Sequence, residues 1–542
     1  CLKKKIESDI QCQTAVGHTR WATHGQVSEV NAHPHISGGF AIVHNGIIEN
    51  YQEIRKELIA ANFKFESETD SEIIAHLLHQ NFLQTRDFAD AFKTCISCLR
   101  GTYAIVAICD SNPNMIIGTK QGSPMTVGLS SNEESFYIAS DAVALSSICE
   151  ELICLKEGDI VICQKCHTPK CNTLEYTILD ASGNKVKRNK MKNNISLAAI
   201  SKAGFEDFML KEIFEEPCVI SRIFDNFNSD FEIAKYKEVS IIACGSSFYA
   251  GLLAKYWIED LVNIHVDVEI ASEFRYRKTP LFKDNIYIFI SQSGETIDTL
   301  EALRKIKAAD FETLALVNVE NSSIAREADR FININAGIEI GVASTKAFVA
   351  QIMTMLLLSV KNLHNIKEVE QAMQTVLDNK NDLKTIANKI KDCKSLFYIG
   401  RGPSYPIALE GALKIKEIAY ISAEGYPAGE IKHGPIAMID NEIHTVVIAP
   451  MDKYFGKTLS NTQEILARNG RVIFLTTQKT QDHIESQHKN KNVDIIFLPD
   501  VEGVCQAFVS ISAIHMLAYY TSKIKGFDVD KPRNLAKSVT VE

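Results

Sequence analysis

A Ser-Gln-Ser-Gly sequence at 291–294 follows a short apolar run near the middle of the chain. The run, residues 286–290, is unbroken and rich in β-branched side chains, which is typical of a strand covered on both faces of a parallel sheet. A helix is expected directly afterwards, over 296–307. Backbone N–H groups and hydroxyls around the positive end of a helix suit a phosphate group. An ordinary N-capped turn explains the same residues, so this loop alone leaves both interpretations open.

Glu410, Lys414 and Glu417 follow i, i+4, i+7 spacing and share one face of an expected helix. A solvated ladder of Glu–Lys pairs is the commoner meaning of such spacing. The loop that follows, 423–435, combines glycine, proline, carboxylates and His433, which is more typical of an active-site edge than of a connector. A lysine and a carboxylate near one carbonyl group suit proton transfer beside that carbonyl, with the histidine as a second acid or base.

The end of the chain, residues 528–542, shows neither a helix nor a sheet period. It nevertheless closes with a β-branched run, which a frayed end does not need. We interpret it as a tail that folds back and carries Lys537 into a site, and disorder is the alternative.

Donor groups are dense in two short stretches of the first part of the chain, 17–25 and 44–46. An arginine such as Arg20 can grip an α-carboxylate through a bidentate pair. The side chain of Asn45 and the N–H of Gly46 can form a two-donor oxyanion hole. Asn-Gly is also a good type I′ turn, which is the default interpretation without these neighbours.

Two kinds of secondary-structure rhythm must position these residues. Up to about residue 180, strands are expected at 14–18, 40–43, 103–109, 115–118, 135–139 and 159–163, and helices at 51–61 and 70–80, the second capped by Thr69 or Asp70. This order lacks a strict βαβ rhythm and predicts a layered α+β domain. A polar, lysine-rich segment at 181–204 follows and is expected to be a linker.

From residue 239 strands and helices alternate. Buried strands are expected at 239–243, 286–290 and 313–319, and again at 396–399, 445–449, 471–476 and 495–498. The two halves resemble each other in detail, which indicates an internal duplication of one doubly wound unit. In such sheets ligands bind at the carboxyl ends of the strands, where the hydroxyl-rich loops fall, and this favours the phosphate interpretation.

Composition excludes several classes of function. The chain has 542 residues, a formal charge of −9, 46% apolar and 23% charged residues, which is ordinary for a globular protein and unlike a polyanion-binding one. No apolar run is long enough for a membrane span, and no signal peptide is visible. Fourteen scattered cysteines fit free thiols in the cytoplasm.

One cysteine cluster, Cys163, Cys166, His167 and Cys171, resembles a haem-attachment or zinc pattern. Haem attachment requires export, and structural zinc usually draws on two separated knuckles. The cluster also lies between two expected strands, 159–163 and 174–179, so we expect a hairpin tip and no metal.

Long motifs carry a resemblance to a known family. They are His-Thr-Arg-Trp-Ala-Thr-His-Gly at 18–25, Asn-Ala-His-Pro-His at 31–35, His-Asn-Gly at 44–46, Ser-Glu-Thr-Asp-Ser-Glu at 67–72, Ser-Gln-Ser-Gly-Glu-Thr at 291–296, Gly-Val-Ala-Ser-Thr-Lys-Ala-Phe at 341–348 and the tail. Together they strongly resemble the glutamine–fructose-6-phosphate aminotransferases across almost the whole chain. The resemblance implies an Ntn-hydrolase-like α+β sandwich followed by two doubly wound sugar isomerase (SIS) domains. It implies conversion of glutamine and fructose 6-phosphate to glucosamine 6-phosphate and glutamate, with no cofactor, in a homodimer.

The same resemblance implies roles for individual residues. Glutamine would be held by Arg20, Trp21, Thr23, His24, Gly46 and Asp70, with Asn45 and Gly46 as the oxyanion hole and Trp21 helping to gate ammonia. The sugar phosphate would lie on Ser246, Ser247, Ser291, Gln292, Ser293 and Thr296. Lys537 would form a Schiff base with the ketose, Glu417 would transfer the proton between the first two carbons, Lys414 would support it, and His433 of a partner subunit would open the ring.

The beginning of the chain departs from the family pattern. Family members begin with Cys-Gly-Ile-Val-Gly, whereas Leu-Lys-Lys-Lys-Ile follows Cys1 here and the arginine motif arrives far sooner. We therefore expect an incomplete glutaminase domain at 1–185 that lacks its first strand and nucleophile, with Cys1 a coincidental start. A linker at 186–210, SIS domains at 211–378 and 379–525 and a tail at 526–542 are expected to follow.

Three alternatives stay open. The enzyme of amino-sugar biosynthesis could act only as an isomerase or with free ammonia, because its glutaminase half is incomplete. SIS-type modules also serve as non-catalytic sugar-phosphate sensors, although Lys414, Glu417, His433 and Lys537 together argue against that. A pseudoenzyme remnant with exposed apolar surface is the third alternative.

Overall fold

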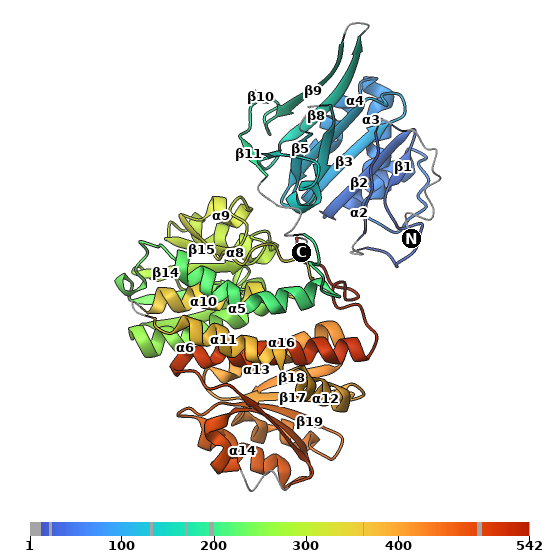
Figure 1. The fold of residues 1–542 in the computed structure, drawn as a ribbon. Coiled ribbons are helices and arrows are strands. Elements are labelled where there is room, and N and C mark those ends of the chain that lie inside the picture. Colours follow the sequence, from blue (N-terminus) through green and yellow to red (C-terminus); the bar gives the residue numbers. More distant parts are fainter. Residues whose placement is uncertain are drawn as a thin grey trace. The chain divides into compact units, whose positions relative to one another are not determined.

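The computed structural model describes residues 12, 14–20, 24–130, 134–168, 171–193, 200–360, 363–484 and 490–540, with only the backbone of 166–168 and 171–173. The chain divides into two compact units, Cys1–Ile200 with Val539–Glu542, and Ser201–Ser538 (Figure 1). We refer to them as the N-terminal and the C-terminal unit.

Two antiparallel sheets form the N-terminal unit. The larger has the order β1-β2-β3-β4-β8-β9-β10 and the smaller the order β11-β7-β5-β6. The larger sheet contains β1 (His35–Ser37), β2 (Phe40–Ile48), β3 (Gly101–Cys109), β4 (Met115–Gln121), β8 (Ile160–Thr168), β9 (Cys171–Leu179) and β10 (Lys185–Val186). The smaller contains β5 (Thr126–Leu129), β6 (Phe136–Ala139), β7 (Glu151–Cys154) and β11 (Lys190–Lys192), and a short helix η1 (Ala142–Leu145) follows β6.

Three helices cover one face of the larger sheet, and the smaller sheet covers the other. The helices are α2 (Tyr51–Ala60), α3 (Glu72–Thr85) and α4 (Phe88–Ser97). Alternate residues of β3 divide between these layers, because Ile105 packs with the helices whereas Ala104 and Val106 pack with the smaller sheet. The described part of this unit is therefore a helix–sheet–sheet sandwich, which confirms the predicted α+β class.

Several local predictions for this unit need correction. No strand forms at 14–18, where the described backbone is irregular and the Thr14 hydroxyl donates to the carbonyl of Pro113 at 2.6 Å. Helix α3 begins at Glu72, and neither Thr69 nor Asp70 caps it. The Asp70 carboxylate accepts the N–H of Ile48 instead, at 2.8 Å, so tertiary contact overrides a local capping preference.

Two five-stranded parallel sheets form the C-terminal unit. Their orders are β13-β12-β14-β15-β16 and β18-β17-β19-β20-β21, so both read 2-1-3-4-5 in chain order, as the predicted duplication requires. The first sheet contains β12 (Glu238–Ala243), β13 (His265–Ile270), β14 (Asn285–Ser291), β15 (Thr313–Val317) and β16 (Arg330–Asn333). The second contains β17 (Ser395–Gly400), β18 (Ser422–Pro427), β19 (His444–Ala449), β20 (Arg471–Thr477) and β21 (Val493–Leu498). Sequence reasoning missed β13, β16 and β18, because these strands at or next to the sheet edges are partly exposed and lack an apolar run.

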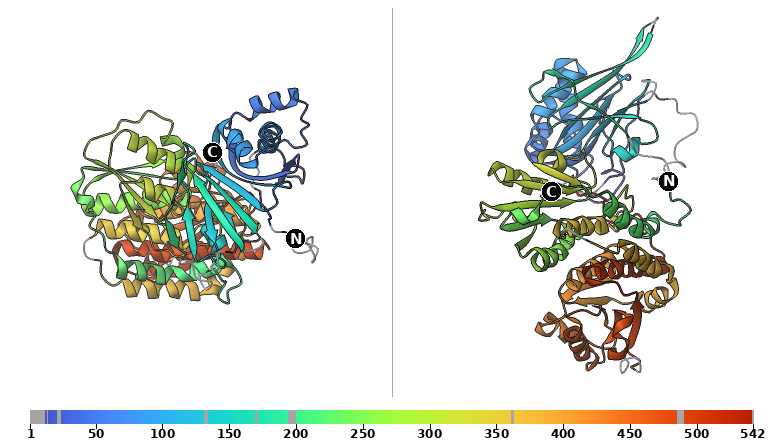
Figure 2. Two further views of the ribbon diagram at one scale, coloured as in Figure 1. Left: turned by 90° about the horizontal axis from the view of Figure 1, so that it is seen from above. Right: turned by 60° about the vertical axis from the view of Figure 1, so that its left-hand side comes forward.

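A layer of helices lies between the two sheets (Figure 1, Figure 2). The helices packed in this layer are α5 (Phe208–Asn226), α6 (Gly245–Val262), α10 (Lys346–Ser359), α11 (Ile366–Asp378), α12 (Lys380–Ile390), α13 (Ser404–Ala419) and α16 (Gln506–Ile524). The outer face of the first sheet carries α7 (Ala271–Phe274), α8 (Ile297–Ala308) and α9 (Ser323–Glu327), and that of the second carries α14 (Phe455–Leu466) and α15 (Gln481–Ile484). Short 3-10 helices are η2 (Ile233–Lys235), η3 (Glu430–His433), η4 (Pro435–Met438), η5 (Gln478–Thr480) and η7 (Gly503–Cys505).

Strand β14 is buried on both faces, which explains its uninterrupted apolar sequence. Ile286, Ile288 and Ile290 face the central helical layer, whereas Tyr287 and Phe289 face the outer helices. A strand buried on both faces needs apolar side chains at both parities.

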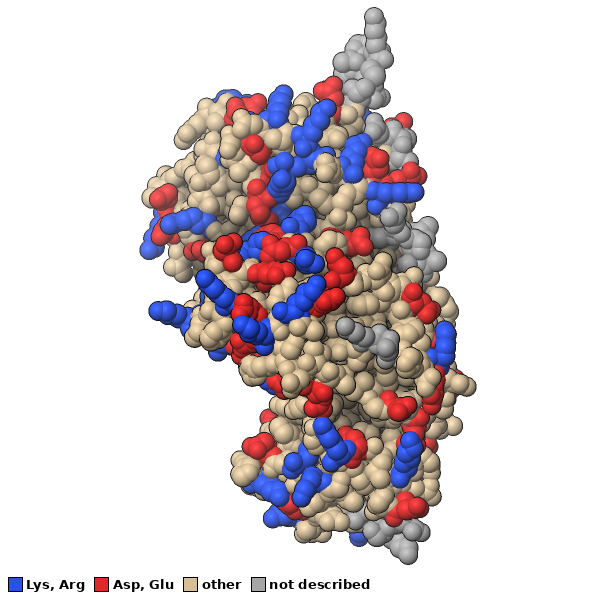
Figure 3. Space-filling view, turned by 90° about the vertical axis from the view of Figure 1, so that its left-hand side faces the viewer, with Lys and Arg blue, Asp and Glu red and all other residues tan. Residues whose placement is uncertain are grey.

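Helix α16 resembles a membrane span in length and composition, but 89% of its most apolar window is buried inside the C-terminal unit. It is therefore the core helix of this layer. On the face drawn in Figure 3, basic and acidic side chains are interspersed.

We expect Ile288→Ala to destabilise the C-terminal unit by about 2–5 kcal/mol, because it leaves a cavity at the centre of the sheet. Ile270→Ala is the matched control, since Ile270 in the same sheet is 44% exposed and its replacement should cost less than about 0.5 kcal/mol. Denaturant unfolding of both variants checks this. Equal losses for the two would contradict the described packing.

Candidate active sites

Hydroxyl groups gather at the carboxyl ends of β12 and β14. These neighbouring strands pair Ala243 with Ile290, so the loops that follow them leave the sheet at the same level. They are also the strands at which the chain order of the sheet reverses, where doubly wound sheets bind ligands. The geometry thus brings the predicted phosphate residues to one edge.

The loop after β14 is tightly ordered by its own hydroxyls. Ser291 is buried, lies 3.0 Å from the hydroxyl of Thr296 and accepts the N–H of Gly294 at 3.0 Å. The Ser293 hydroxyl accepts the N–H of Glu295 at 3.1 Å. Gly294 has φ +65°, and a Cβ there would lie 1.9 Å from the Ser322 hydroxyl, so only glycine fits. Gln292 joins this loop to β15, because its carbonyl accepts the N–H of Asn318 at 3.1 Å.

Side chains of two helices, α13 and α10, hold the two serines that follow β12. The Ser246 hydroxyl donates to Glu410 Oε1 in α13 at 3.0 Å. Gln351 in α10, which is buried, donates to the Ser247 hydroxyl at 3.0 Å. These contacts fix both serines at the positive end of α6, the arrangement that suits a phosphate.

Lys414 lies between two carboxylates of its own helix. Its Nζ is 2.7 Å from Glu417 Oε2 and 3.3 Å from Glu410 Oε1. Lys414 and Glu410 are fully buried, whereas the Glu417 side chain is 20% exposed. Burial opposes the charge on Lys414, but the two carboxylates outweigh it and raise the pKa of this lysine. The spacing therefore marks a buried charged cluster and not a solvated ladder.

The same cluster continues into two further helices. His515 Nδ1 in α16 is 2.6 Å from Glu216 Oε1 in α5, and His515 Nε2 is 3.7 Å from Glu410 Oε1. Glu216 and His515 are fully buried. Burial alone would lower the pKa of His515, but the carboxylates of Glu216 and Glu410 raise it to about 9.

The tail folds back along the C-terminal unit. The Asp530 carboxylate accepts the N–H groups of Phe208 and Met209 at 3.0 and 2.8 Å, at the start of α5. Arg533 lies over the ring of Tyr420, with 4.2 Å to the ring centroid. The predicted folded tail, rather than the disordered alternative, is what the structure shows.

Lys537 ends this path beside the phosphate loop. Its neighbour Ser538 lies 2.9 Å from the Ser293 hydroxyl, and Lys537 pairs with the buried carboxylate of Glu339. Burial opposes ionisation of Glu339, but Lys537 holds its pKa below the ordinary value. The neighbouring Glu212 has its pKa raised to about 7, by burial and then by the charge of Glu339.

His433 stands apart from these contacts. It lies at the end of η3, is exposed, and makes no hydrogen bond or ion pair with the part of the chain that the structure describes. The structure thus connects Ser246 with Glu410, Lys414 and Glu417, and connects Ser293 with Lys537, but it does not connect His433 to either group.

In the N-terminal unit Asn45 and Gly46 lie inside β2. They pair with Ala104 and Tyr103 of β3, so the alternative of a type I′ turn is wrong. Gly46 has φ +130°, and a Cβ there would lie 2.0 Å from the Thr102 carbonyl oxygen. Only glycine can occupy this position inside the strand, which agrees with the predicted use of the Gly46 N–H as an oxyanion-hole donor.

A histidine orients the Asn45 amide. His18 Nδ1 accepts the N–H of Arg20 at 2.9 Å, so the ring proton sits on Nε2, which donates to Asn45 Oδ1 at 2.7 Å. The amide nitrogen of Asn45 is then the end that can donate to an oxyanion.

The other predicted glutamine residues lie close by. His24 Nδ1 is 3.7 Å from the buried carboxylate of Asp70, which also binds the backbone of β2. The Arg20 guanidinium donates to the carbonyls of Gln26, His24 and Gly25 at 2.9–3.3 Å. Trp21 and Thr23 lie outside the described residues.

Four histidines, His18, His33, His35 and His44, surround this region. Burial is the main cause that lowers the pKa of each, to about 4 for His44 and about 2 for His33. His44 Nδ1 lies 2.8 Å from the Ser71 hydroxyl and the ring is fully enclosed. These rings are therefore neutral at pH 7.

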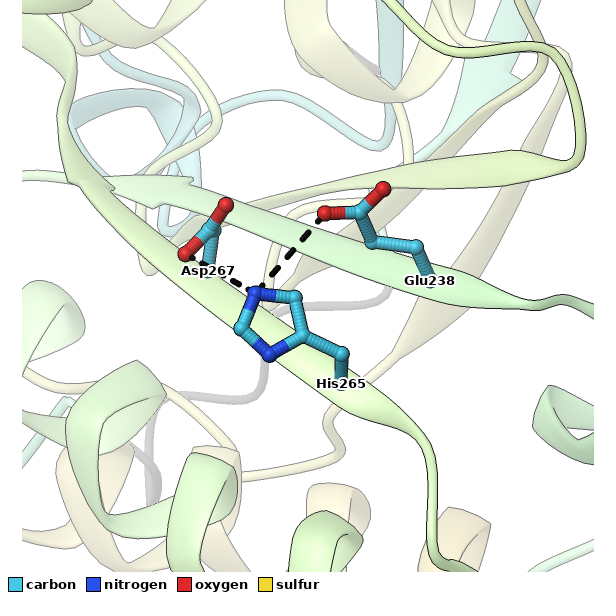
Figure 4. Close-up of side chains that lie close together, drawn as sticks. All are labelled: Glu238, His265 and Asp267. Carbon is cyan, nitrogen blue, oxygen red and sulfur yellow. Dashed lines mark ion pairs between the residues drawn. The ribbon is translucent and has the colours of Figure 1, made fainter.

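Two clusters of the chain contain residue types that can ligate a metal. The predicted hairpin is confirmed, since β8 pairs with β9, and Cys163 is a buried thiol whose pKa burial raises to about 12. The side chains of Cys166, His167 and Cys171 lie outside the described residues. Among the described residues, Glu238, His265 and Asp267 bring one donor atom each within 4.8 Å, at the amino ends of β12 and β13 (Figure 4). Their ion pairs of 3.8 and 3.5 Å explain that arrangement without an ion.

Sequence reasoning missed six residues of these sites, Glu339, Glu216, His515, Gln351, Glu212 and His18. Glu339 meets Lys537 and Glu216 meets His515 across 198 and 299 positions, and no local spacing signals such pairs. Gln351 lies in the apolar sequence of α10, and Glu212 lies among other charged residues of α5 that do not mark it out. His18 was recognisable only as part of a histidine-rich stretch.

Family models match most of the chain. A glutamine amidotransferase domain matches residues 18–147, and a SIS domain matches 232–361 and 389–522. The chain is 41% identical to glutamine–fructose-6-phosphate aminotransferase [isomerizing] of Bradyrhizobium diazoefficiens, over 100% of this chain and 91% of that protein. It is 42% identical to the protein of the same name from Aquifex aeolicus, over 98% and 90%. The solved C-terminal domain of glucosamine-fructose-6-phosphate aminotransferase from Francisella tularensis matches with 37% identity and a TM-score of 0.57, over 61% of this chain and 100% of that one.

The buried neutral His44 predicts acid sensitivity of the N-terminal unit. A pKa lowered to about 4 means that only the unfolded chain takes up this proton between pH 6.5 and 4. Stability is therefore fully present above pH 6.5 and is lost as the pH falls, by about 2 kcal/mol from this group between pH 6.5 and 5. Thermal unfolding of the wild type and His44→Gln should show the shallower pH dependence in the variant. Identical dependence would contradict the assignment.

Proposed function

The chain belongs to the isomerizing glutamine–fructose-6-phosphate aminotransferases, and we propose that it transfers the amide nitrogen of glutamine to fructose 6-phosphate and isomerises the sugar to glucosamine 6-phosphate. The observation that carries this is the 41% identity along 100% of the chain, with an amidotransferase domain and two SIS segments in the family's order. The geometry supports it, because the folded tail connects Lys537 to the hydroxyl-rich loop that contains Ser293.

The roles proposed in the C-terminal unit follow from position. Hydroxyls of Ser246, Ser247, Ser291, Ser293 and Thr296, with Gln292, would hold the phosphate at the edge of the first sheet. Lys537 Nζ would condense with the C2 carbonyl with loss of water, once it leaves Glu339. Ammonia would then displace the lysine from C2. Glu417 would move a proton from C1 to C2, and the C1 hydroxyl would give its proton to the imine nitrogen, so that C2 carries the amine and C1 becomes the aldehyde.

The roles proposed in the N-terminal unit concern the glutamine amide. Asn45 and the N–H of Gly46 would stabilise the oxyanion that forms on the amide carbonyl. Asp70 and Arg20 would hold the amino and carboxylate groups of the substrate. Arg20 already has a fixed position through its bonds to the carbonyls of residues 24–26.

We also propose a homodimer in the cytoplasm. The exposed position of His433, without a partner among the described residues, supports a role at the site of a second subunit. The cysteines described are free thiols, which supports a reducing compartment.

We expect Lys537→Ala and Glu417→Ala each to lower the conversion of fructose 6-phosphate by at least about a hundredfold, because each removes a group that acts on the reacting carbons. The measurement is formation of glucosamine 6-phosphate with ammonium as nitrogen donor. Lys523→Ala is the control, since Lys523 pairs with Glu206 and Asp207 away from these residues. Full activity in both variants would show that the roles are wrong.

We expect Asn45→Ala to lower glutamine-dependent synthesis by about 10²–10³, the usual cost of one oxyanion-hole donor, and to leave the ammonium-dependent rate unchanged. The two nitrogen donors are compared on the same protein preparation. An equal fall in both rates would contradict the separation of roles. A wild type that uses ammonium but not glutamine would favour the ammonia-dependent alternative.

A further inference from the structure

One carboxylate oxygen in the C-terminal unit accepts a hydrogen bond from a serine and faces a lysine and a histidine at ion-pair distance. Glu410 Oε1 lies 3.0 Å from the Ser246 hydroxyl, 3.3 Å from Lys414 Nζ and 3.7 Å from His515 Nε2. Its other oxygen, Oε2, is buried and has no hydrogen-bond partner among the described residues, and neither has His515 Nε2, so the ring acts on Glu410 through charge alone. The orientation of this carboxylate therefore depends on the three groups around Oε1.

His515 joins this cluster to α16 and, through Glu216, to α5. Its Nδ1 is 2.6 Å from Glu216 Oε1, and the Ser512 hydroxyl donates to Glu216 Oε2 at 2.9 Å. Phe348 of α10 packs against the ring, with 6.1 Å between centroids. The ring thus has a fixed position between α5, α10 and α13.

Charge balance requires the ring to be protonated. Glu216 and Glu410 are fully buried, and Lys414 is shared between Glu410 and Glu417. If the His515 ring were neutral, Lys414 would be the only positive charge beside the buried carboxylates of Glu216 and Glu410 among the described residues, and it also pairs with Glu417. One carboxylate would then be an uncompensated buried charge, which is strongly destabilising. The titratable groups that face the ring from neighbouring elements are Glu216 in α5 and Glu410 with Lys414 in α13.

We propose that His515 is a positioning residue, whose charged ring, anchored by Glu216, fixes Glu410 and through it the Lys414–Glu417 pair and Ser246. The proposal rests on the proposed function and adds to it a residue that does not touch the sugar. Without the ring charge, Glu410 is free to turn its second oxygen toward Lys414. That movement withdraws Lys414 from Glu417 and misplaces the carboxylate that transfers the proton.

The test is the kinetics of His515→Gln with ammonium as nitrogen donor. We expect kcat to fall by about a hundredfold, the loss that a misplacement of about 1 Å produces. KM for fructose 6-phosphate should rise by far less than kcat falls, because Ser246 loses its orientation but Ser247 and Ser291 keep their own partners. Wild-type kcat in a folded His515→Gln variant would overturn the proposal, as would a rise in KM with kcat unchanged.

His444→Gln is the matched control for loss of a buried histidine. His444 in β19 is 6% exposed and contacts Cys393 and the carbonyl of Glu442, outside the cluster. Its kcat should equal that of the wild type. Thermal unfolding of both variants shows whether they are folded.

A double-mutant cycle separates positioning from general destabilisation. Glu216→Gln removes the anchor of the ring and should lower kcat by itself, whereas the double variant should lose no more than His515→Gln alone. Additive losses would overturn the proposal. If His515→Gln does not fold, Glu216→Gln alone tests the proposal. A wild-type kcat in that variant would contradict the proposal that Glu216 anchors the His515 ring.

The ring can also be observed without turnover. NMR of ¹³C-labelled histidine rings, assigned by the signal lost in His515→Gln, should show His515 protonated at pH 7.5. A neutral ring there would overturn the inference even if the wild type proved inactive. A wild type that forms no glucosamine 6-phosphate, with a protonated ring, would instead overturn the proposed function.

Discussion

The hydrogen bond from the Ser246 hydroxyl to Glu410 Oε1 connects the two halves of the C-terminal unit at the candidate sugar site. Ser246 lies at the start of α6, which follows strand β12 of the first sheet, and Glu410 lies in α13 of the duplicated half. The oxygen that accepts this bond also lies beside Lys414 and His515. The position of the loop after β12, the charge of the buried cluster and the orientation of Glu417 therefore depend on one buried carboxylate, which has no contact with solvent.

The two halves have the same topology but different chemistry. Gly245 and Gly402 occupy corresponding turns with φ of +56° and +53°. In the first half open space surrounds the glycine, and serine hydroxyls follow it. In the second half a Cβ at Gly402 would lie 2.3 Å from the ring of Tyr454, and Arg401 donates to Asn461 at 3.0 Å. The ring of Tyr454 therefore fills the space beside Gly402, whereas the described residues leave the space beside Gly245 open next to Ser246 and Ser247.

The tail completes the site from the far end of the chain. Asp530 binds the N-terminus of α5, and Ser538 binds the loop of Ser293. These two anchors bracket Lys537, whose ammonium pairs with the buried Glu339. The flexible side chain of Lys537 is thus held near the loop of Ser293 by contacts of residues that precede and follow it in the sequence.

The sequence by itself determined the fold class, the repeated strand order and most candidate residues. Buried parallel strands such as 286–290 need apolar side chains on both faces, and long motifs such as 18–25 and 291–296 identify the family. Asn45-Gly46 is compatible with either a turn or an oxyanion hole, and only the tertiary structure excludes the turn by placing the pair inside β2. Only the tertiary structure likewise shows that Asp70 binds β2 and does not cap α3. The sequence also could not predict that Glu339, Glu216 and His515 belong to these sites. They meet their partners across roughly 200 to 300 positions, and only the packing of helices between two sheets brings such residues together.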